Sequence, residues 1–271
     1  AQTQPQGIPA GRIPATAMAG GDAAHDGRQP GPPPTGAPAI VWSGALTGPI
    51  AAAPVVADGF VYVPDASGVL QALDAGDGYP RWQFAGNGAI TASVAVDRGL
   101  VVVGTASGEV DTLDATTGAA RWRAAIGHGI DAAPVVANGV VYMGATNGQL
   151  SALDAAAGTI VWQATAPAAI HAPPTAAGGL VVVSSADGSV TAFAAATGAR
   201  RWSVAVGAAN LASPAFADGQ IAVVVEAGRV LMLDAATGRE RWRAEIGAPL
   251  GSTPAIGNGL VSILDANGGQ R

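Results

Sequence analysis

Six tryptophans recur at intervals of 40 residues, and this period constrains the fold more than any other feature of the chain. They are Trp42, Trp82, Trp122, Trp162, Trp202 and Trp242, and the sequence contains no other tryptophan. Glycines keep the same period, as in the series that begins Gly59, Gly99, Gly139. A fixed period of this length is the signature of a repeat architecture, in which each repeat is one small unit of secondary structure.

Each repeat contains four short runs that read as strands. In the third repeat they cover residues 132–137, 140–144, 149–154 and 160–165. Asn138-Gly139 and Asn147-Gly148 separate them, and such pairs favour tight hairpin turns because glycine accepts positive φ. The second run is apolar on both faces, which predicts a strand sandwiched between neighbours. The fourth run carries arginine beside its tryptophan, as expected of a charged outer edge strand: Arg81, Arg121, Arg123, Arg201, Arg241 and Arg243.

These patterns predict an all-β chain that forms a β-propeller of about six four-stranded blades. Residues 37–271 are assigned to the propeller and residues 1–36 to a Pro/Gly-rich N-terminal extension. A solenoid is the alternative, but it needs polar capping repeats that the terminal repeats do not show. Residues 251–271 supply only two strands and the start of a third. The last blade is therefore expected to be incomplete or to be closed by the N-terminal strand around Trp42.

Even with such closure, one inner strand of the last blade would still be missing. Two alternatives remain open for it. Either the leader around Gly20–Gly27 adds a strand, or the chain is cut from a longer ring.

Composition excludes several classes of protein. The net charge is −6 and the 13 basic residues are dispersed, which argues against nucleic-acid binding. The apolar runs are far shorter than the ~20 residues of a membrane-spanning helix, so we expect no membrane insertion of this segment. The absence of cysteine removes disulfides, thiolate metal sites and cysteine nucleophiles.

Four segments carry a more specific motif: ALDAGDGYPRW at 72–82, TLDATTGAARW at 112–122, ALDAAAGTIVW at 152–162 and MLDAATGRERW at 232–242. They resemble the tryptophan-docking motif of pyrroloquinoline-quinone-like propeller repeats, a quinoprotein-type family. That family includes quinone-dependent dehydrogenases, sensor ectodomains and periplasmic scaffold lipoproteins of outer-membrane protein assembly.

The resemblance implies structural roles for two sets of residues. Each tryptophan would wedge between adjacent blades while its N–H binds a carbonyl: Trp82, Trp122, Trp162, Trp202 and Trp242. Each aspartate would accept backbone N–H bonds in the turn before the glycine: Asp74, Asp114, Asp154 and Asp234. Ala194 stands in place of the aspartate in the fourth repeat, which predicts a looser turn there.

A polar constellation is expected where the innermost strands begin. Thr91, Asp131 and His171 lie at equivalent positions of consecutive repeats and would face the central channel. Asp131 and His171 are candidates for a carboxylate–imidazole pair that holds a small ligand or a metal at the channel mouth. The alternative is a hydrated channel lining, because a metal site needs three or more convergent ligands.

The sequence favours a binding protein over an enzyme. Dehydrogenases that resemble it add long insertions that wall a pocket, whereas the 40-residue frame here has none, so no catalytic residue, cofactor or metal is predicted. We expect a non-catalytic scaffold of the periplasmic or extracellular space with protein partners. The alternatives are a ligand-sensing ectodomain and a quinone-dependent dehydrogenase-like enzyme.

Overall fold

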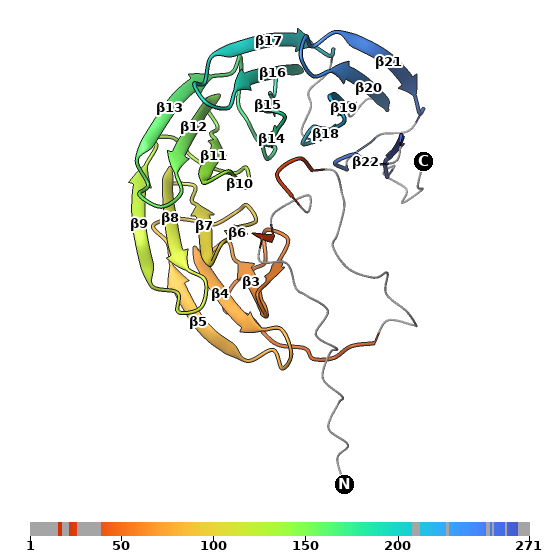
Figure 1. The fold of residues 1–271 in the computed structure, drawn as a ribbon. Helices are drawn as coiled ribbons and strands as arrows, with labels where there is room; N and C mark the ends of the chain where they lie inside the picture. Colours follow the sequence, from red (N-terminus) through yellow and green to blue (C-terminus); the bar gives the residue numbers. More distant parts are fainter. Residues whose placement is uncertain are drawn as a thin grey trace.

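Four-stranded antiparallel sheets repeat along the chain in the computed structural model, as the 40-residue period predicts. The structure describes residues 16–17, 22–25, 39–207, 212–225, 228–247, 250, 252–257 and 259–264. Five complete sheets follow one another around an arc, and each is a propeller blade (Figure 1). The prediction of an all-β propeller is confirmed. The described residues form no helix, and therefore none that is long and apolar enough to cross a membrane.

The blades are built from consecutive strands, the first of each lying innermost. Blade 1 contains β2 (Val55–Ala57), β3 (Phe60–Pro64), β4 (Val69–Asp74) and β5 (Pro80–Ala85). Blade 2 contains β6 (Ala95–Asp97), β7 (Leu100–Gly104), β8 (Glu109–Asp114) and β9 (Ala120–Ala125). Blade 3 contains β10 (Val135–Ala137), β11 (Val140–Gly144), β12 (Gln149–Asp154) and β13 (Ile160–Thr165).

The remaining strands continue this order. Blade 4 contains β14 (Thr175–Ala177), β15 (Leu180–Ser184), β16 (Ser189–Ala194) and β17 (Arg200–Ala205). Blade 5 contains β18 (Ala215–Ala217), β19 (Gln220–Val225), β20 (Arg229–Asp234) and β21 (Glu240–Glu245). A sixth sheet contains β22 (Ala255–Gly257) and β23 (Leu260–Ser262). A short strand, β1 (Thr16–Ala17), pairs with the inner edge of β6.

The first hairpin of each blade is closed by a two-residue turn. In blade 3, Ala137 pairs with Val140, and Asn138 and Gly139 between them have φ of 52° and 77°. Two successive positive φ angles are characteristic of the type I′ turn, whose twist matches that of the strands. The local sequence thus dictates the hairpin.

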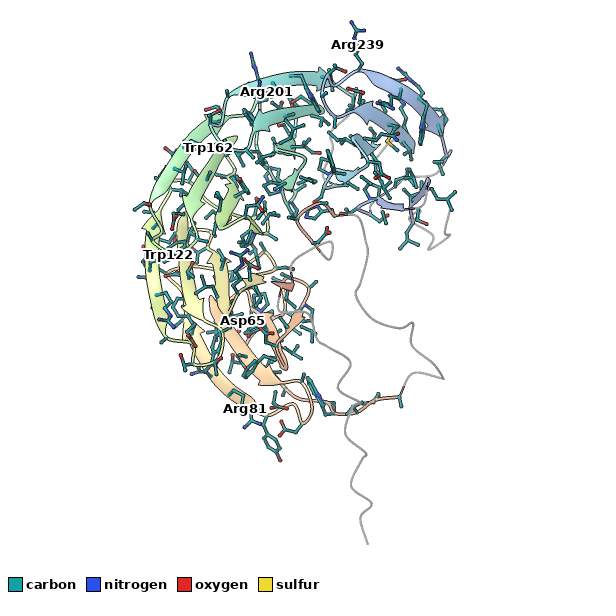
Figure 2. The ribbon with its side chains drawn as sticks, in the orientation of Figure 1. Asp65, Arg81, Trp122, Trp162, Arg201 and Arg239 are labelled. Atoms are coloured by element: carbon teal, nitrogen blue, oxygen red, sulfur yellow. The ribbon has the colours of Figure 1, made fainter. Side chains whose placement is uncertain are left out.

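The outermost pair of strands in each complete blade is interrupted by a bulge. In blade 1 Ala72 faces Trp82 but the next residue, Leu73, faces Pro80, so Arg81 is left over. Bulges and charges both discourage pairing of an edge strand with another chain. Arg81, Arg201 and Arg239 project from the outer rim (Figure 2).

The apolar core lies between neighbouring blades. β11 and β12 are buried along almost their whole length, whereas β13 alternates between exposed and covered residues. The largest cluster of buried side chains runs from Ala95 in blade 2 to Phe193 in blade 4. A blade that has a neighbour on either side therefore buries both faces, and burial of this apolar surface is the main favourable term in folding.

Two faces of the ring can be distinguished by their connections. The turn face contains the turns between the first and second and between the third and fourth strands of each blade, joined by bonds such as Ala75 N–H to Gly59 O, 2.9 Å. The loop face contains the turns between the second and third strands and the loops between blades, joined by bonds such as Gly86 N–H to Gly68 O, 2.8 Å.

The sixth sheet is not closed by the N-terminal strand in the described part of the chain. The indole of Trp42 docks on blade 1, where its Nε1 donates to Ala75 O at 3.0 Å, but residues 39–45 form no strand. In the part of the chain that the structure describes, β23 pairs with β22 and with no other strand. Of the two forms expected for the last blade, the described residues have the incomplete one. Among the described residues, which end at 264, there is no third strand to link β23 to the Trp42 segment.

The leader also differs from expectation. Its described parts do not add a strand to the last blade but lie against the inner strands of other blades. β1 pairs with β6 of blade 2, and the carbonyls of Ala23 and Ala24 accept the N–H groups of Ala176 and Phe216, at 2.7 and 2.8 Å. Inner strand edges present unpaired backbone groups, and the leader satisfies some of them on three blades.

Candidate functional site

The predicted carboxylate–imidazole pair is brought together on the loop face. His171 Nδ1 lies 2.7 Å from Asp131 Oδ2, across the boundary between blades 3 and 4. Both residues precede the innermost strand of their blade, and these strands adjoin one another around the centre of the ring. The two side chains are 37% and 36% exposed, so a solute can reach the pair.

The pair offers limited chemistry. Asp131 Oδ1 is buried and has no hydrogen-bond partner among the described residues, so this oxygen is not open to a solute. Thr91 is exposed at the equivalent position of blade 2, and the structure records no bond from it to the pair. No group of three metal-ligating side chains occurs in the described part of the chain. A ligand site at Thr91, Asp131 and His171 stays a prediction.

His25 lies in the docked leader, against the innermost strand of blade 4. The sequence places it in the leader but does not predict its burial. It is 1% exposed, and its Nδ1 lies 3.4 Å from the hydroxyl of Thr175, which donates to the Pro214 carbonyl. Its Nε2 has no partner in the described residues. Burial lowers the pKa of His25 to about 4, and a hydrogen bond from the imidazole to the Pro214 carbonyl opposes this shift only partly. No local pattern announces this burial, because the partners lie 150 or more residues away.

Acid should loosen the docked leader. The pKa of His25 is about 4 when docked and 6.5 as the reference value, so the undocked form binds more protons between these pH values. The stabilisation is therefore complete above pH 6.5 and falls as the pH is lowered toward 4, by up to about 3 kcal/mol. Amide NMR signals of Ala176 and Phe216 should shift over this range.

The His25→Phe variant is the matched control, because its apolar ring cannot be protonated. Its Ala176 and Phe216 signals should stay constant over the same pH range. Equal changes in the variant and the original chain would contradict a role for His25.

Tryptophans join neighbouring blades through one repeated contact. Besides Trp42, which donates to Ala75 O in the same way, four indoles donate Nε1–H to a backbone carbonyl 33 residues further on, in the next blade: Trp82 to Ala115 O at 3.0 Å, and Trp122, Trp162 and Trp202 to Ala155, Ala195 and Ala235 O at 2.8 Å. A buried indole normally needs such an acceptor. The wedge and the hydrogen bond together fix the spacing of the blades.

Trp242 differs from the other four. Its side chain is 41% exposed, and no carbonyl partner is recorded for it in the described residues. The docking of Trp242 between blades therefore stays a prediction.

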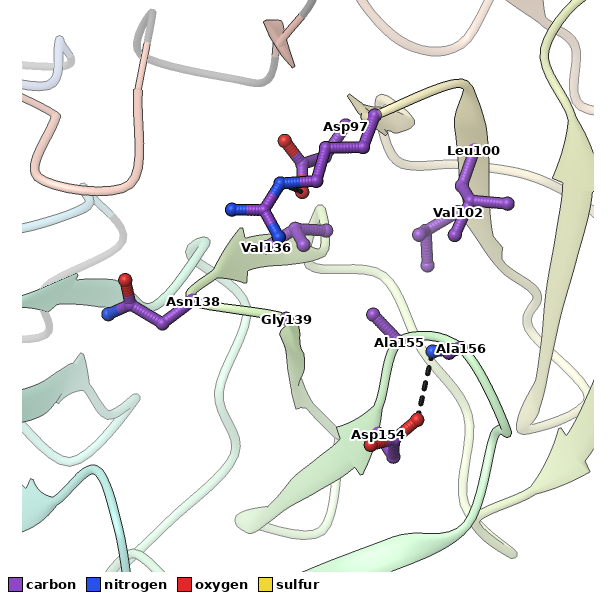
Figure 3. A pocket seen from close by; sticks show the side chains of 10 residues that line it. Asp97, Leu100, Val102, Val136, Asn138, Gly139, Asp154, Ala155 and Ala156 are labelled. Carbon is purple, nitrogen blue, oxygen red and sulfur yellow. Dashed lines mark hydrogen bonds and ion pairs between the residues drawn. The ribbon is translucent and has the colours of Figure 1, made fainter.

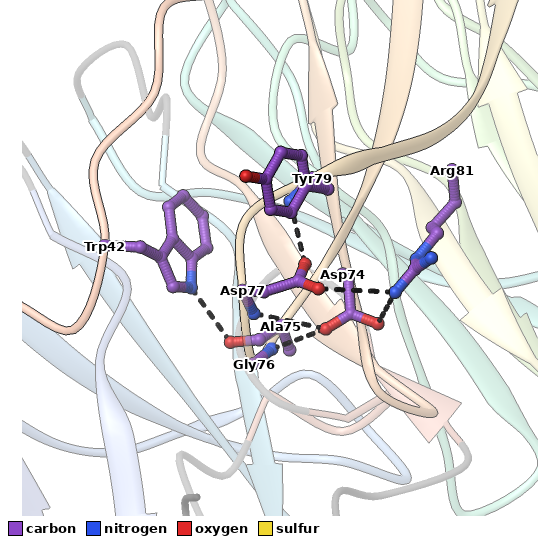
Figure 4. A network of polar contacts seen from close by, with 7 residues as sticks. All are labelled: Trp42, Asp74, Ala75, Gly76, Asp77, Tyr79 and Arg81. Carbon is purple, nitrogen blue, oxygen red and sulfur yellow. Dashed lines mark hydrogen bonds and ion pairs between the residues drawn. The ribbon is translucent and has the colours of Figure 1, made fainter. Parts of the chain in front are cut away.

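The motif aspartates organise the turns on the turn face. In blade 1, Asp74 Oδ1 accepts the N–H groups of Gly76 and Asp77, and Oδ2 accepts from Arg81 at 2.8 Å (Figure 4). These hydrogen bonds, that from Arg81 foremost, hold the pKa of Asp74 below its usual value. The equivalent aspartates also accept turn N–H groups: Asp114, Asp154 and Asp234.

The turn at Ala194 is not looser than the others. Gly198 N–H donates to Ala194 O at 2.8 Å, the same distance as from Gly158 to Asp154. The predicted looser turn is therefore wrong. Backbone hydrogen bonds close the turn by themselves, and the carboxylate adds to them.

The sequence matches one family model in two overlapping stretches, residues 35–130 and 108–264. That family is described as outer membrane protein assembly factor BamB. No curated protein matches the sequence.

Solved structures share the fold at low identity. BamB from Moraxella catarrhalis is 24% identical, with 84% of each chain covered and a TM-score of 0.57. The computationally designed protein Ika8 is 19% identical, with 82% of this chain and 69% of that chain covered and a TM-score of 0.73. Quinohemoprotein alcohol dehydrogenase ADHIIG from Pseudomonas putida HK5 is 22% identical over 76% of this chain and 43% of its own, with a TM-score of 0.65.

Proposed function

The chain belongs to the family described as outer membrane protein assembly factor BamB, and we propose on this basis that it is a non-catalytic propeller scaffold that binds a protein partner. The scaffold acts in the extracytoplasmic space, periplasmic or extracellular. Its rigid loops form the contact surface, and no quinone, metal or other cofactor is needed for this role.

One observation carries the proposal: the polar residues of the repeat motif are occupied in holding the blades together. Asp74 binds its own turn and Arg81, and the indole N–H of Trp122 is satisfied by Ala155. The connections are also short, as in the loops at residues 86–94 and 126–134. Catalysis usually requires a pocket that excludes water, and such loops have no residues to cover one.

The loop face is suited to recognise a protein. Its loops are tied to neighbouring turns by backbone bonds such as Ile126 N–H to Gly108 O, 2.9 Å, and Ala166 N–H to Gly148 O, 2.8 Å. Between these anchors it exposes Asn87, His128 and the Asp131–His171 pair. A preorganised surface loses little conformational entropy on binding, which favours affinity.

Site-specific photocrosslinking tests the proposal. A photoreactive amino acid at His128, exposed on the loop face, should crosslink in the native cells to a component of outer-membrane protein assembly. The same amino acid at Arg201, exposed on the outer rim, is the control and should give no such product (Figure 2). Equal capture at both positions, or capture at Arg201 alone, would contradict binding through the loop face.

The quinone-dependent enzyme remains a second candidate because the fold is shared with a quinohemoprotein alcohol dehydrogenase. Addition of pyrroloquinoline quinone with Ca²⁺ separates the two functions, since a ligand that binds the folded state raises the Tm. A scaffold should show no change in Tm. A saturable rise would favour the enzyme.

A further inference from the structure

A cavity of about 320 Å³ lies between blades 2 and 3 on the turn face (Figure 3). Leu100 and Val102 of β7 form one wall, and Val136 of β10 with Ala155 and Ala156 of the blade 3 turn form the other. Polar side chains also line it: Asp97, Arg98, Asn138 and Asp154. The volume is at the lower end of the range of about 300–1,000 Å³ for small-molecule sites.

Equivalent places in two other blade boundaries are filled by tyrosine. Tyr62 stands 40 residues before Val102; it is fully buried between blades 1 and 2, and its hydroxyl donates to Ala115 O at 3.1 Å. Tyr142 stands 40 residues after Val102, and its hydroxyl donates to Ala195 O at 3.4 Å between blades 3 and 4. Each tyrosine ring lies about 6 Å from the docked tryptophan of its own blade.

The boundary between blades 4 and 5 is filled from the opposite wall. The first strand of blade 5, β18, carries Phe216, which stands at the same position of the repeat as Val136. A Cβ added to Gly178 would lie 2.6 Å from the Phe216 ring, so this ring packs directly over the glycine backbone. Between blades 2 and 3 both positions hold valine, Val102 and Val136. The cavity is therefore the space that an aromatic ring occupies at the other three boundaries between complete blades.

The cavity also has a hydrogen-bond acceptor for that ring. Ala115 O accepts two donors, the indole N–H of Trp82 and the hydroxyl of Tyr62. Its equivalent, Ala155 O, accepts the indole N–H of Trp122 at 2.8 Å, and no hydroxyl stands in the tyrosine position. A carbonyl oxygen has two lone pairs, so Ala155 O can accept a second bond.

We propose that this cavity is a binding site for a small phenol. The ring lies where the tyrosine ring lies at the neighbouring boundaries, and the hydroxyl donates to Ala155 O. This site is separate from the loop face and does not depend on the proposed scaffold function.

Calorimetric titration with phenol tests the proposal. One site per chain is expected, with a Kd of the order of 1 mM for so small a ligand. Toluene has nearly the same shape but cannot donate to Ala155 O, so it should bind about tenfold more weakly. Equal binding of phenol and toluene would overturn the assigned hydrogen bond and with it the selectivity for phenols.

Variants that copy the chain's own fillers should close the site. Val102→Tyr places a tyrosine ring in the cavity, as Tyr62 does at the preceding boundary, and should abolish phenol binding. Val136→Phe combined with Arg98→Gly copies the Phe216–Gly178 pair; Arg98 already has a φ of 48°, which glycine accepts readily. This second variant decides the matter if the first does not fold. Retention of the original affinity in a folded variant would overturn the proposal.

The reverse substitution is the matched positive control. Tyr142→Val should open the corresponding space between blades 3 and 4, beside Ala195 O, and raise the number of phenol sites from one to two. A count that stays at one would overturn the proposal that an absent tyrosine creates the site.

Discussion

Trp162→Ala is expected to destabilise the protein by about 3–5 kcal/mol, enough to lower the Tm by roughly 10 °C. The indole is 8% exposed, belongs to the largest core cluster and packs against Tyr142, with ring centroids 5.9 Å apart and ring planes tilted by 41°. Its removal also leaves Ala195 O without the indole donor at 2.8 Å. The cost thus adds a cavity between two blades to a lost hydrogen bond. Thermal and denaturant unfolding measure it.

Trp242→Ala is the control for this prediction. Its indole has the same place in the repeat but is 41% exposed, so its loss should cost less than about 1 kcal/mol. A similar cost at the two positions would contradict the view that wedging between blades, rather than contacts within one blade, makes these tryptophans stabilising.

Gly198→Ala is expected to cost about 2–4 kcal/mol for two separable reasons. The residue has a φ of 71°, which an L side chain disfavours, and its new Cβ would lie 2.6 Å from Cε3 of Trp162. The ring is held by its own hydrogen bond and cannot withdraw without loss. The free energy of unfolding, measured by denaturant titration, should fall accordingly.

Gly219→Ala measures separately the part of this cost that comes from the positive φ of the backbone. Its φ is 72°, but nothing lies within 4 Å of an added Cβ, so only about 1–2 kcal/mol should be lost. In a Trp162→Ala background the cost of Gly198→Ala should fall to this same value. An unchanged cost there would show that the clash with Trp162 is not its cause.

Much of the fold could be predicted because the signals are local and repeated. Asn138-Gly139 specifies a hairpin by its φ angles, and the apolar runs specify buried strands. The Asp131–His171 pair was also predictable, since equivalent positions of adjacent repeats must lie side by side. The prediction for the turn at Ala194 is wrong because a sequence motif reports only side chains. The turn is closed by backbone hydrogen bonds, which do not depend on the aspartate.

The sequence by itself determined the number, order and strand content of the complete blades, because a strict period with turn residues at fixed offsets leaves little choice of local structure. Only the tertiary structure decided where the leader docks, that Trp242 is partly exposed, and that a cavity separates blades 2 and 3. These features depend on whether side chains from distant segments fill a shared space. A valine at position 102 is as good a strand residue as a tyrosine, and only packing against the next blade reveals the difference.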